Sequence, residues 1–254
     1  MTDHQTVLIT GGNRGLGRAA ALHLADAGVD VLLTYRSNAD EAAAVVAEIE
    51  ARGRHAVALR LDTTETATFP AFADEVRRSL RETFGSDTLD VLVNNAGVAA
   101  ATPIGDTDEA VIGQLVGVHF TGVVMLTQTL LPLLADGGRV INTSTGLARF
   151  TGDPSYSVYA AMKGAVEVWT RYLAKAVGGR GITANVIAPG PIATDFGGGY
   201  VRDNEAVRSA LGGSAALGRV GEPDDIGSAI AALAVGGLGW VTGQRIEASG
   251  GTLL

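Results

Sequence analysis

The stretch Thr10-Gly-Gly-Asn-Arg-Gly-Leu-Gly17 joins a short apolar run to a long amphipathic segment near the start of the chain. The spacing of apolar side chains predicts a buried strand over residues 7–10 and a helix over residues 16–27. Glycines at positions 11, 15 and 17 let the backbone turn tightly and approach a pyrophosphate, whose charge the helix N-terminus would attract. Any tight strand-to-helix turn favours glycine, but at the first such junction this pattern predicts a dinucleotide site.

Short β-branched runs alternate with longer helical patterns along the rest of the chain. Strands are expected at residues 7–10, 31–35, 56–61, 91–94, 139–143, 183–188 and 244–247, and helices at 16–27, 39–52, 70–84, 108–134, 156–177 and 224–234. This alternation predicts parallel βαβ units, and strands that are apolar on both faces predict helices on both sides of the sheet. No linker, repeat or charge block divides residues 1–254, so we expect one doubly wound α/β domain.

Composition narrows the classes of function. The net charge of −8 argues against a nucleic-acid surface, and the absence of cysteine excludes disulfides and thiolate metal sites. The four histidines show no metal-ligand spacing, so no metal site is expected. The opening residues lack the basic and apolar regions of an export signal, which predicts a cytoplasmic protein.

Residues 111–135 carry no charged side chain, which raises the possibility of a membrane span. Polar side chains, glycines and Pro132 interrupt this run. The interruptions favour a helix that is buried on most sides, in part against another subunit, over a helix in a membrane.

Residues 195–221 break the alternation of strands and helices. They contain glycines at positions 197, 198, 199, 212, 213 and 218, with a short helical piece over 201–211. One interpretation is a loose surface excursion. Because the segment follows the carboxyl end of a strand, where ligands bind in open α/β sheets, we expect a substrate lid hinged on these glycines.

The end of the second expected strand indicates which dinucleotide binds. An NAD site usually carries an acid about 20 residues after the glycine-rich turn, where it bonds the ribose 2′-hydroxyl. Here Arg36 follows Tyr35, and no acid stands at this tip. The guanidinium groups of Arg36 and Arg14 can fork onto a 2′-phosphate, unless both are ordinary solvated side chains. The pattern favours NADP(H) over NAD(H).

Five motifs follow one another in order: Thr10-Gly-x3-Gly-x-Gly17, Asp62, Asn94-Asn-Ala-Gly97, Tyr159-x3-Lys163, and Pro189-Gly190 followed by Thr194. In this order they make the sequence similar to the short-chain dehydrogenase/reductase family over essentially the whole chain. The resemblance is greatest to the 3-oxoacyl reductase-like branch. It implies a Rossmann domain with a mainly parallel seven-stranded sheet, nicotinamide-dependent ketone or alcohol chemistry, and a homo-oligomer, with a tetramer favoured over a dimer.

The resemblance also assigns residues to the cofactor. It implies that Asp62 contacts the adenine, that Asn95 supports the cofactor, and that Ile192 and Thr194 hold the carboxamide. With the glycine-rich turn and the two arginines, the expected cofactor-binding residues are Gly11, Asn13, Arg14, Gly15, Leu16, Gly17, Arg36, Asp62, Asn95, Ala96, Gly97, Tyr159, Lys163, Pro189, Gly190, Ile192 and Thr194.

Tyr159 and Lys163 lie one helical turn apart, so both side chains face the same way. Hydride delivery to a ketone leaves charge on oxygen, which needs a positioned proton donor. A phenol has an ordinary pKa of about 10, and a nearby ammonium is expected to lower it. The chain has 17 arginines and only two lysines, Lys163 and Lys175, so a lysine at this position stands out. Tyr156 lies near the same face and is expected to line the pocket.

One position departs from the family pattern. The family usually has an asparagine in the long helix before the fifth strand, where it helps to hold a water chain from the lysine to solvent. This chain has His119 there, within Val118-His-Phe-Thr-Gly122. An imidazole can donate and accept hydrogen bonds, so it can keep such a relay. His119 can equally be a packed helix residue without a role.

The sequence Asn142-Thr-Ser-Thr-Gly146 places three hydroxyls at the end of the fifth strand. Family members commonly end this strand with a serine that hydrogen-bonds the substrate oxygen, and the match places Thr145 rather than Ser144 at that position. Side chains alternate along a strand, so only one of these two hydroxyls faces Tyr159. A bulge would exchange the two faces, and Ser144 therefore stays as the second candidate.

These features predict an NADPH-dependent oxidoreductase that reduces a small-molecule ketone to a secondary alcohol, with a tyrosine as proton donor. The expected catalytic residues are Tyr159, Lys163, Thr145, Ser144 and His119. The alternative is a catalytically weak NADP-binding protein of the same fold that acts as a sensor or scaffold. The identity of the ketone stays open, because Arg149 and Phe150 could meet an anionic or aromatic substrate or could face solvent.

Overall fold

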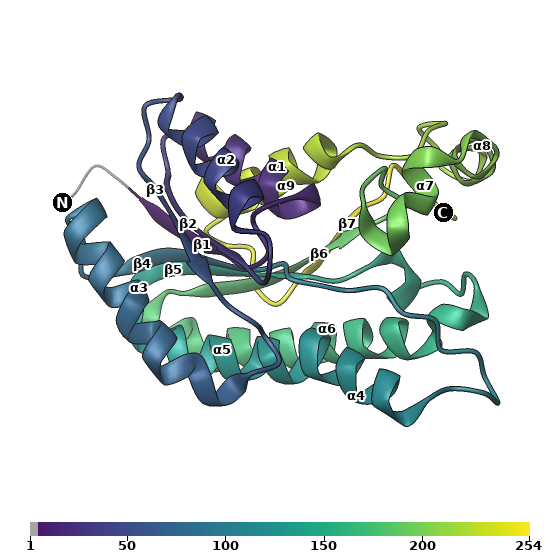
Figure 1. Ribbon diagram of the computed structural model, residues 1–254, viewed down its shortest axis with the longest axis horizontal. Helices are drawn as coiled ribbons and strands as arrows, with labels where there is room; N and C mark the ends of the chain where they lie inside the picture. Colours follow the sequence, from purple (N-terminus) through teal and green to yellow (C-terminus); the bar gives the residue numbers. More distant parts are fainter. Residues whose placement is uncertain (1–4) are drawn as a thin grey trace.

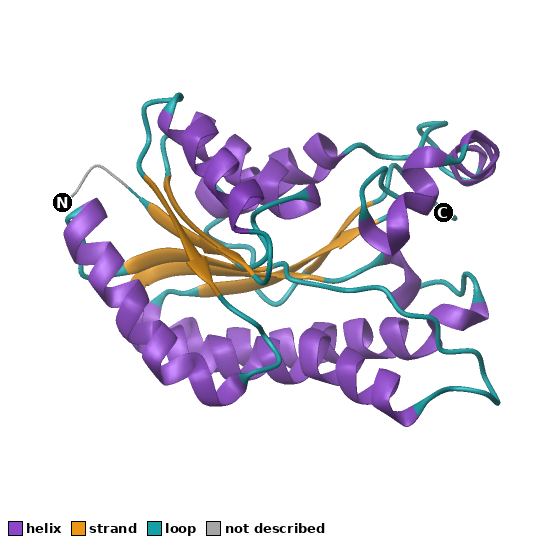
Figure 2. Ribbon diagram, in the orientation of Figure 1, coloured by secondary structure: helices purple, strands orange, loops and turns teal. Residues whose placement is uncertain are grey.

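Seven strands form one sheet in the computed structural model of the protein, which describes residues 5–254 (Figure 2). The strands are β1 (Thr6–Ile9), β2 (Asp30–Tyr35), β3 (Ala56–Arg60), β4 (Leu89–Asn94), β5 (Leu134–Thr143), β6 (Thr183–Pro189) and β7 (Arg245–Ala248). Their order is β3-β2-β1-β4-β5-β6-β7, and every pairing is parallel. The doubly wound α/β fold is confirmed. Residues 1–4, on which the expectation of no export signal partly rests, lie outside the described residues.

Helices cover both faces of this sheet, as Figure 1 shows. On one face lie α1 (Gly15–Asp26), α2 (Ala39–Glu50) and α9 (Pro223–Val235); on the other lie α3 (Phe69–Phe84), α4 (Glu109–Val116), α5 (Gly122–Leu130) and α6 (Ser157–Val177). Strand β1 alternates its side chains between the two layers, with Val7 and Ile9 in one apolar cluster and Leu8 in the other. All four residues of β1 are buried, because a parallel sheet covered on both faces leaves no strand face in water.

The strand order reverses at β1, because the chain moves outward to β3 and then returns to place β4 on the other side of β1. In open α/β sheets ligands bind in the crevice at this point, beyond the carboxyl ends of the strands. Buried polar groups tie the tips of β4 and β5 to α6. The Asn94 side-chain amide donates to Asn142 Oδ1 (2.8 Å), and the Asn142 amide donates to Thr170 Oγ1 (2.9 Å).

The segment expected as one helix over 108–134 consists of four pieces. After α4 come a π-helical turn (Gly117–Thr121), α5 and a 3-10 turn (Leu131–Leu133). Single π turns in α-helices often mark functional sites, and this one carries His119. By length and composition the run Glu109–Leu133 is apolar enough to cross a membrane, but it packs with α3 and α6 as one layer over the sheet (Figure 1).

The segment 195–221 connects β6 to α9 and lies beyond the carboxyl ends of β6 and β7 (Figure 1). Its helical part is divided into α7 (Tyr200–Asp203) and α8 (Glu205–Gly213), where the sequence predicted a single piece over 201–211. The division occurs because Asn204 leaves the helical conformation and its side chain caps α8, accepting a hydrogen bond from a backbone N–H of that helix.

The two ends of this segment differ in how they are held. At its start, the three glycines at positions 197–199 have φ of +64°, +74° and +78°, a region that other L-residues rarely adopt. Near its far end, the Leu217 N–H donates to the Gly250 carbonyl oxygen (2.9 Å), and the Leu253 N–H donates to the Ser214 carbonyl oxygen (3.0 Å). The C-terminal tail therefore anchors the segment near its second end, whereas its first end carries the three glycines.

Candidate active site

A cavity of about 1080 Å³ opens beyond the carboxyl ends of the strands. Its walls come from the glycine-rich turn, the tips of β2 to β6, the start of α6, the segment 195–221 and the C-terminal tail. All but one of the residues expected to bind the cofactor line it: Gly11, Asn13, Arg14, Gly15, Leu16, Arg36, Asp62, Asn95, Ala96, Gly97, Tyr159, Lys163, Pro189, Gly190, Ile192 and Thr194. The exception is Gly17.

The glycine-rich turn contains two backbone conformations that require glycine, with φ of +65° at Gly11 and +54° at Gly15. Both residues line the cavity beside the N-terminus of α1, where a pyrophosphate would be stabilised. Gly17 has a packing role, and its expected contact with the cofactor stays a prediction. A side chain there would collide with the Gly11 carbonyl oxygen and the Asn95 amide. Its absence lets α1 pack closely against the strand tips.

Asn95 and Thr10 cross-link the tips of β1 and β4. The Thr10 hydroxyl accepts hydrogen bonds from the backbone N–H groups of Asn95 and Ala96, each at 2.9 Å. The Asn95 amide in turn donates to the Thr10 carbonyl oxygen (3.0 Å). Asn95 thus supports the cavity wall by fixing the glycine-rich turn. Thr10 belongs to the quoted motif, but the sequence did not single it out as a site residue.

The end of the cavity beyond β2 and β3 carries the charged groups expected for the adenosine part of a cofactor. Arg14 and Arg36 are exposed, and in the described part of the chain neither guanidinium donates a hydrogen bond, so both can meet a phosphate. Asp62 has a lowered pKa: burial opposes its ionisation, but hydrogen bonds from Thr64 and the charges of Arg36 and Arg60 outweigh burial.

An acid that the sequence analysis missed also reaches this end. Glu41, in the first turn of α2, lines the cavity and accepts a hydrogen bond from the Asn13 side-chain amide (2.7 Å). The position of Glu41 carries no separate signal in the sequence, because acids are common in the first turn of a helix, where they interact favourably with the helix dipole.

Tyr159 and Lys163 project from the start of α6 and are both buried, with 7% and 4% of their surface exposed. The Lys163 ammonium donates to the Thr143 carbonyl oxygen (2.7 Å) and lies 5.8 Å from the centre of the Tyr159 ring. Thr143 is the last residue of β5, so this contact ties the catalytic helix to the strand tip.

Burial governs the ionisation of both groups. It raises the pKa of Tyr159 to about 12, although a hydrogen bond with Thr145 acts in the opposite direction. It lowers the pKa of Lys163 to about 8. The expectation that the ammonium brings the phenol pKa down is therefore wrong for the protein alone, because desolvation sets the direction of the shift and Lys163 is not among its causes. Tyr159 is a protonated donor throughout the neutral pH range.

The two hydroxyls beyond β5 have different partners. The Thr145 side chain faces the Tyr159 hydroxyl, whose pKa it lowers, and its Oγ1 accepts from the Leu147 N–H (3.3 Å). The Ser144 hydroxyl instead donates to Glu167 Oε1 (2.5 Å). The alternation of side chains along the strand thus continues through its tip.

His119 is fully buried, with its ring edge-on to that of Tyr159 and the ring centres 5.0 Å apart. Its Nε2 lies 2.8 Å from the Val98 carbonyl oxygen, and because a carbonyl oxygen only accepts, this contact assigns the ring proton to Nε2; Nδ1 has no hydrogen-bond partner among residues 5–254. Burial, followed by the charge of Lys163, lowers the pKa of His119 to about 3. The ring is therefore neutral and keeps a buried acceptor nitrogen without a protein donor.

The cavity also has a wall of aromatic and aliphatic side chains. Its members are Leu147, Phe150, Tyr156, Phe196, Tyr200, Val201, Val207, Leu211 and Leu253. The rings of Phe196 and Tyr156 lie 5.7 Å and 6.2 Å from that of Tyr159. The sequence analysis did not predict Phe196, Tyr200 and Leu253 as residues of the site. No motif marks them, and only the fold brings them to the cavity. Arg149 turns away from the cavity and pairs with Glu247 (2.7 Å).

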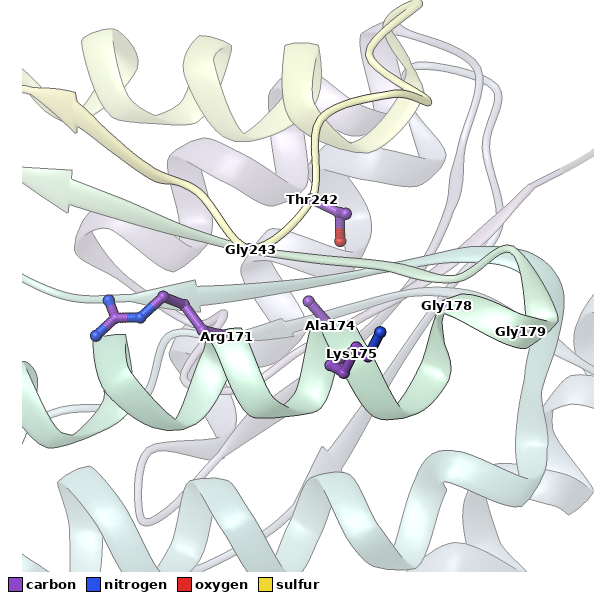
Figure 3. Close-up of a pocket in the computed structure, with 7 residues that line it drawn as sticks. All are labelled: Arg171, Ala174, Lys175, Gly178, Gly179, Thr242 and Gly243. Atoms are coloured by element: carbon purple, nitrogen blue, oxygen red, sulfur yellow. The ribbon is translucent and has the colours of Figure 1, made fainter.

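Figure 3 shows a separate depression of about 500 Å³ between α6 and the loop that leads into β7. Its lining residues are Arg171, Ala174, Lys175, Gly178, Gly179, Thr242 and Gly243. Neither a carboxylate nor an imidazole lines this depression, so the candidate chemistry belongs to the larger cavity.

Comparison with known proteins places the chain in a family. The family model described as enoyl-(acyl carrier protein) reductase matches residues 11–252. The hydroxynaphthalene reductase-like protein Arp2 of Metarhizium brunneum is 34% identical over 259 residues, covering 98% of this chain and 95% of that protein. A 3-oxoacyl-[acyl-carrier-protein] reductase of Synechocystis sp. is also 34% identical, covering 98% of this chain and 97% of that protein.

Solved structures agree with these relatives. The reductase LugOII, which catalyses keto-reduction at C1 during lugdunomycin biosynthesis, superposes with a TM-score of 0.92 at 36% identity and 98% coverage of each chain. The landomycin C-6 ketoreductase LanV with bound NADP and rabelomycin gives a TM-score of 0.88 at 35% identity, covering 98% of this chain and 96% of that chain. The chain belongs to the short-chain dehydrogenase/reductase family, and it is an oxidoreductase of that family.

Proposed function

We propose that the protein reduces a ketone to a secondary alcohol with NADPH, and that the ketone belongs to a fused aromatic ring system. The observation that carries this proposal is the pairing of the Thr145 and Tyr159 side chains, which line the same cavity as the dinucleotide-type turn and the aromatic wall. A carbonyl oxygen beside this pair meets two hydroxyl donors.

The polar part of the cavity fits NADPH. Gly11 and Gly15 permit close backbone approach to the pyrophosphate, and Arg14 and Arg36 offer guanidinium groups to the 2′-phosphate. Bound NADPH supplies the hydride that the carbonyl carbon receives. Structures of relatives with NADP or NADPH support this choice of cofactor.

Thr145 and Tyr159 act on the negative charge that develops on the carbonyl oxygen. Both hydroxyls donate hydrogen bonds to this oxygen, and Tyr159 then transfers its phenolic proton to it. The transfer is favourable because a secondary alkoxide binds a proton more tightly than a phenolate does, even with the pKa of Tyr159 raised to about 12. The alcohol product leaves a phenolate that has to be reprotonated.

Lys163 and His119 serve this reprotonation. The Lys163 ammonium stabilises the phenolate by its charge, and burial holds its pKa at about 8, so it can release a proton near neutral pH. His119 Nδ1 is a buried acceptor without a protein donor, which is the group that a relay water would satisfy. His119 thereby takes the place of the asparagine that the family uses.

The aromatic wall supports the substrate class. Flat fused rings gain from offset or edge-on contacts with Phe150, Tyr156, Phe196 and Tyr200. The last two rings belong to residues 195–221, which we propose to be the substrate lid. Relatives described as a tetrahydroxynaphthalene reductase and an angucycline C-6 ketoreductase act on the same broad class of compound.

A panel of ketones with NADPH and NADH tests the proposal. We expect NADPH oxidation to be fastest with bicyclic or tricyclic aromatic ketones and slower with 3-oxoacyl thioesters and small aliphatic ketones. Preference for the thioesters would overturn the substrate class. Binding of NADPH without turnover of any ketone would favour the alternative of a sensor or scaffold, which the intact pair of Tyr159 and Lys163 does not support.

We also propose a cytoplasmic homo-oligomer, with a tetramer favoured. Large apolar side chains are exposed on the layer of α5 and α6, including Met125 (37%), Val168 (47%) and Tyr172 (74%), and Trp240 is fully exposed. Clusters of exposed apolar groups mark contacts with other chains, and a second copy of this chain would cover them. Light scattering of the purified protein tests this, and a monomer at micromolar concentration would contradict it.

A further inference from the structure

One face of α6 holds the tip of β5. Tyr159, Lys163 and Glu167 are spaced four residues apart, so their side chains form one stripe. Each engages one of the successive residues 143–145. Lys163 donates to the Thr143 carbonyl oxygen (2.7 Å), Glu167 accepts from the Ser144 hydroxyl (2.5 Å), and Tyr159 faces the Thr145 side chain, which lowers its pKa.

Arg245 of β7 completes this arrangement. Its Nε donates to Glu167 Oε1 (2.8 Å), the same oxygen that accepts from the Ser144 hydroxyl. Its Nη2 donates to the Thr145 carbonyl oxygen (3.1 Å), and its Nη1 donates to Glu247 Oε2 (2.7 Å). The Glu167 and Arg245 side chains are only 12% and 20% exposed, so solvent competes weakly for these contacts.

The same chain of charges continues to the C-terminal tail. Glu247 also accepts from Arg149 Nε (2.7 Å) and Nη2 (2.9 Å). Arg149 in turn donates to the carbonyl oxygens of Thr252 (2.7 Å) and Leu253 (3.2 Å), two residues that line the cavity. A chain of alternating charges, Glu167–Arg245–Glu247–Arg149, therefore joins the turn that bears the Thr145 hydroxyl to residues 252–253, the part of the cavity wall that we call the tail wall.

We propose that Glu167 and Arg245 are positioning residues that aim the Thr145 hydroxyl at the substrate oxygen, an inference that rests on the proposed role of Thr145 in ketone reduction. Thr145 is extended (φ −159°, ψ 153°) and caps a 3-10 turn, with its Oγ1 accepting from the Leu147 N–H (3.3 Å) and its carbonyl oxygen from the Ala148 N–H (3.2 Å). Arg245 holds its carbonyl group, and Glu167 holds the side chain of the residue before it. These two contacts hold the backbone on both sides of the Thr145 Cα, and they thereby fix the direction in which the Thr145 hydroxyl points.

The two ends of this chain of charges act on different kinetic constants. Loss of Arg245 misdirects a hydroxyl that acts in the transition state, so it lowers kcat. Loss of Arg149 releases the tail wall, which contacts the body of the substrate, so it raises KM for the ketone with a smaller change in kcat.

A double-mutant cycle between Arg245 and Thr145 tests the inference. We expect Arg245→Met to lower kcat about 10-fold with the dissociation constant for NADPH unchanged. In a Thr145→Ala background the same substitution should lower kcat no further, because its effect passes through the lost hydroxyl. Arg18→Met is the control, since Arg18 forms a more exposed ion pair with Glu48 outside the cavity and its loss should leave kcat unchanged.

The outcomes separate this inference from the proposed function. If Thr145→Ala alone leaves kcat unchanged, the proposed role of Thr145 fails and this inference with it. If Thr145→Ala is impaired but Arg245→Met costs the same factor in both backgrounds, only the positioning role fails. Should Arg245→Met not fold, Glu167→Gln gives the same cycle with a smaller change in volume. Arg245→Lys, which keeps the charge but not the three-way fork, should recover only part of the kcat.

Discussion

The two parts of the cavity are built in different ways. The adenosine part takes Gly11, Arg14, Arg36 and Asp62 from one continuous run of strands and helices near the start of the chain. The catalytic part joins residues from distant segments, and the contact that Arg245 makes with the Thr145 carbonyl oxygen spans 100 positions. A local motif is enough to specify the first part, whereas tertiary packing has to supply the second.

The two parts also differ in their contact with water. The arginines of the adenosine part are exposed, while Tyr159 and Lys163 are almost fully buried. Burial moves the pKa of Tyr159 up to about 12 and that of Lys163 down to about 8. Substitutions in the buried part should therefore change the rate of reaction, and substitutions in the exposed part should change which cofactor is used.

The largest effect is expected at the proton donor. Tyr159→Phe removes the phenolic proton but keeps the ring, so kcat should fall by about 10³-fold while the dissociation constant for NADPH hardly changes. Steady-state kinetics together with a fluorescence titration of NADPH measure both quantities. Tyr156→Phe is the matched control and should cost much less. If Tyr156→Phe were the inactivating change, the assignment of the acid would be wrong.

The hydroxyl beside Tyr159 comes next. Thr145→Ala should lower kcat by about 10²–10³-fold, the usual cost of one lost donor to a developing oxyanion. Thr145→Ser keeps the donor and should stay active, and it should accept bulkier ketones because one methyl group is gone. Ser144→Ala should cost less than Thr145→Ala, since the Ser144 hydroxyl meets Glu167. A larger loss for Ser144→Ala would exchange the two roles.

The exposed part of the cavity is tested through cofactor choice. Arg36→Asp should change the ratio of kcat/KM for NADPH over NADH by about 30-fold or more, because it removes a charge-assisted hydrogen bond and adds a like charge near the 2′-phosphate. Arg77→Asp makes the same change of charge on α3, outside the cavity, and should leave the ratio as it is. Equal use of NADH by the unaltered protein would contradict the prediction.

The burial of Lys163 is expected to appear in the pH dependence of stability. Its pKa is about 8 in the folded protein against 10.5 as the ordinary value, so between these values the unfolded chain binds more protons. The free energy of unfolding should therefore rise with pH in this window, by about 1.4 kcal/mol per pH unit for one proton. Lys163→Met should lack this rise when urea unfolding of the cofactor-free protein is compared at pH 8 and 10. An identical rise in both proteins would show that Lys163 is not the source.

The smallest effect is expected at His119. His119→Leu should slow the return of the proton and alter the pH dependence of kcat, with a loss below about 10-fold. The pKa of His119 is near 3, so the altered profile would reflect the relay rather than titration of the imidazole itself. His119→Asn should keep activity, because it restores the group the family uses. Matching pH profiles for the wild type and the Leu variant would indicate a packing role.

Several parts of the site were accessible from the sequence because their signals are local. The turn between β1 and α1 requires a positive φ at Gly11 and Gly15, and glycine is the residue that adopts it readily. The spacing of Tyr159 and Lys163 follows from the period of one helix. Other parts were not accessible. Glu41 had a complete explanation in its own helix, and Arg245 gave no signal because its partners lie as many as 100 positions away.

The sequence by itself determined the class of fold and the place of the cofactor turn, because hydrophobic period and backbone sterics depend on residues that are close in the chain. It also put Thr145 and Ser144 on opposite faces, since alternation is a property of any strand. Only the tertiary structure decided which group each hydroxyl contacts. Only the tertiary structure set the pKa of Tyr159 at about 12, a rise where the charge of Lys163 alone predicted a fall. The physical reason is that desolvation depends on everything packed around a group, including an aromatic wall contributed by residues far along the chain.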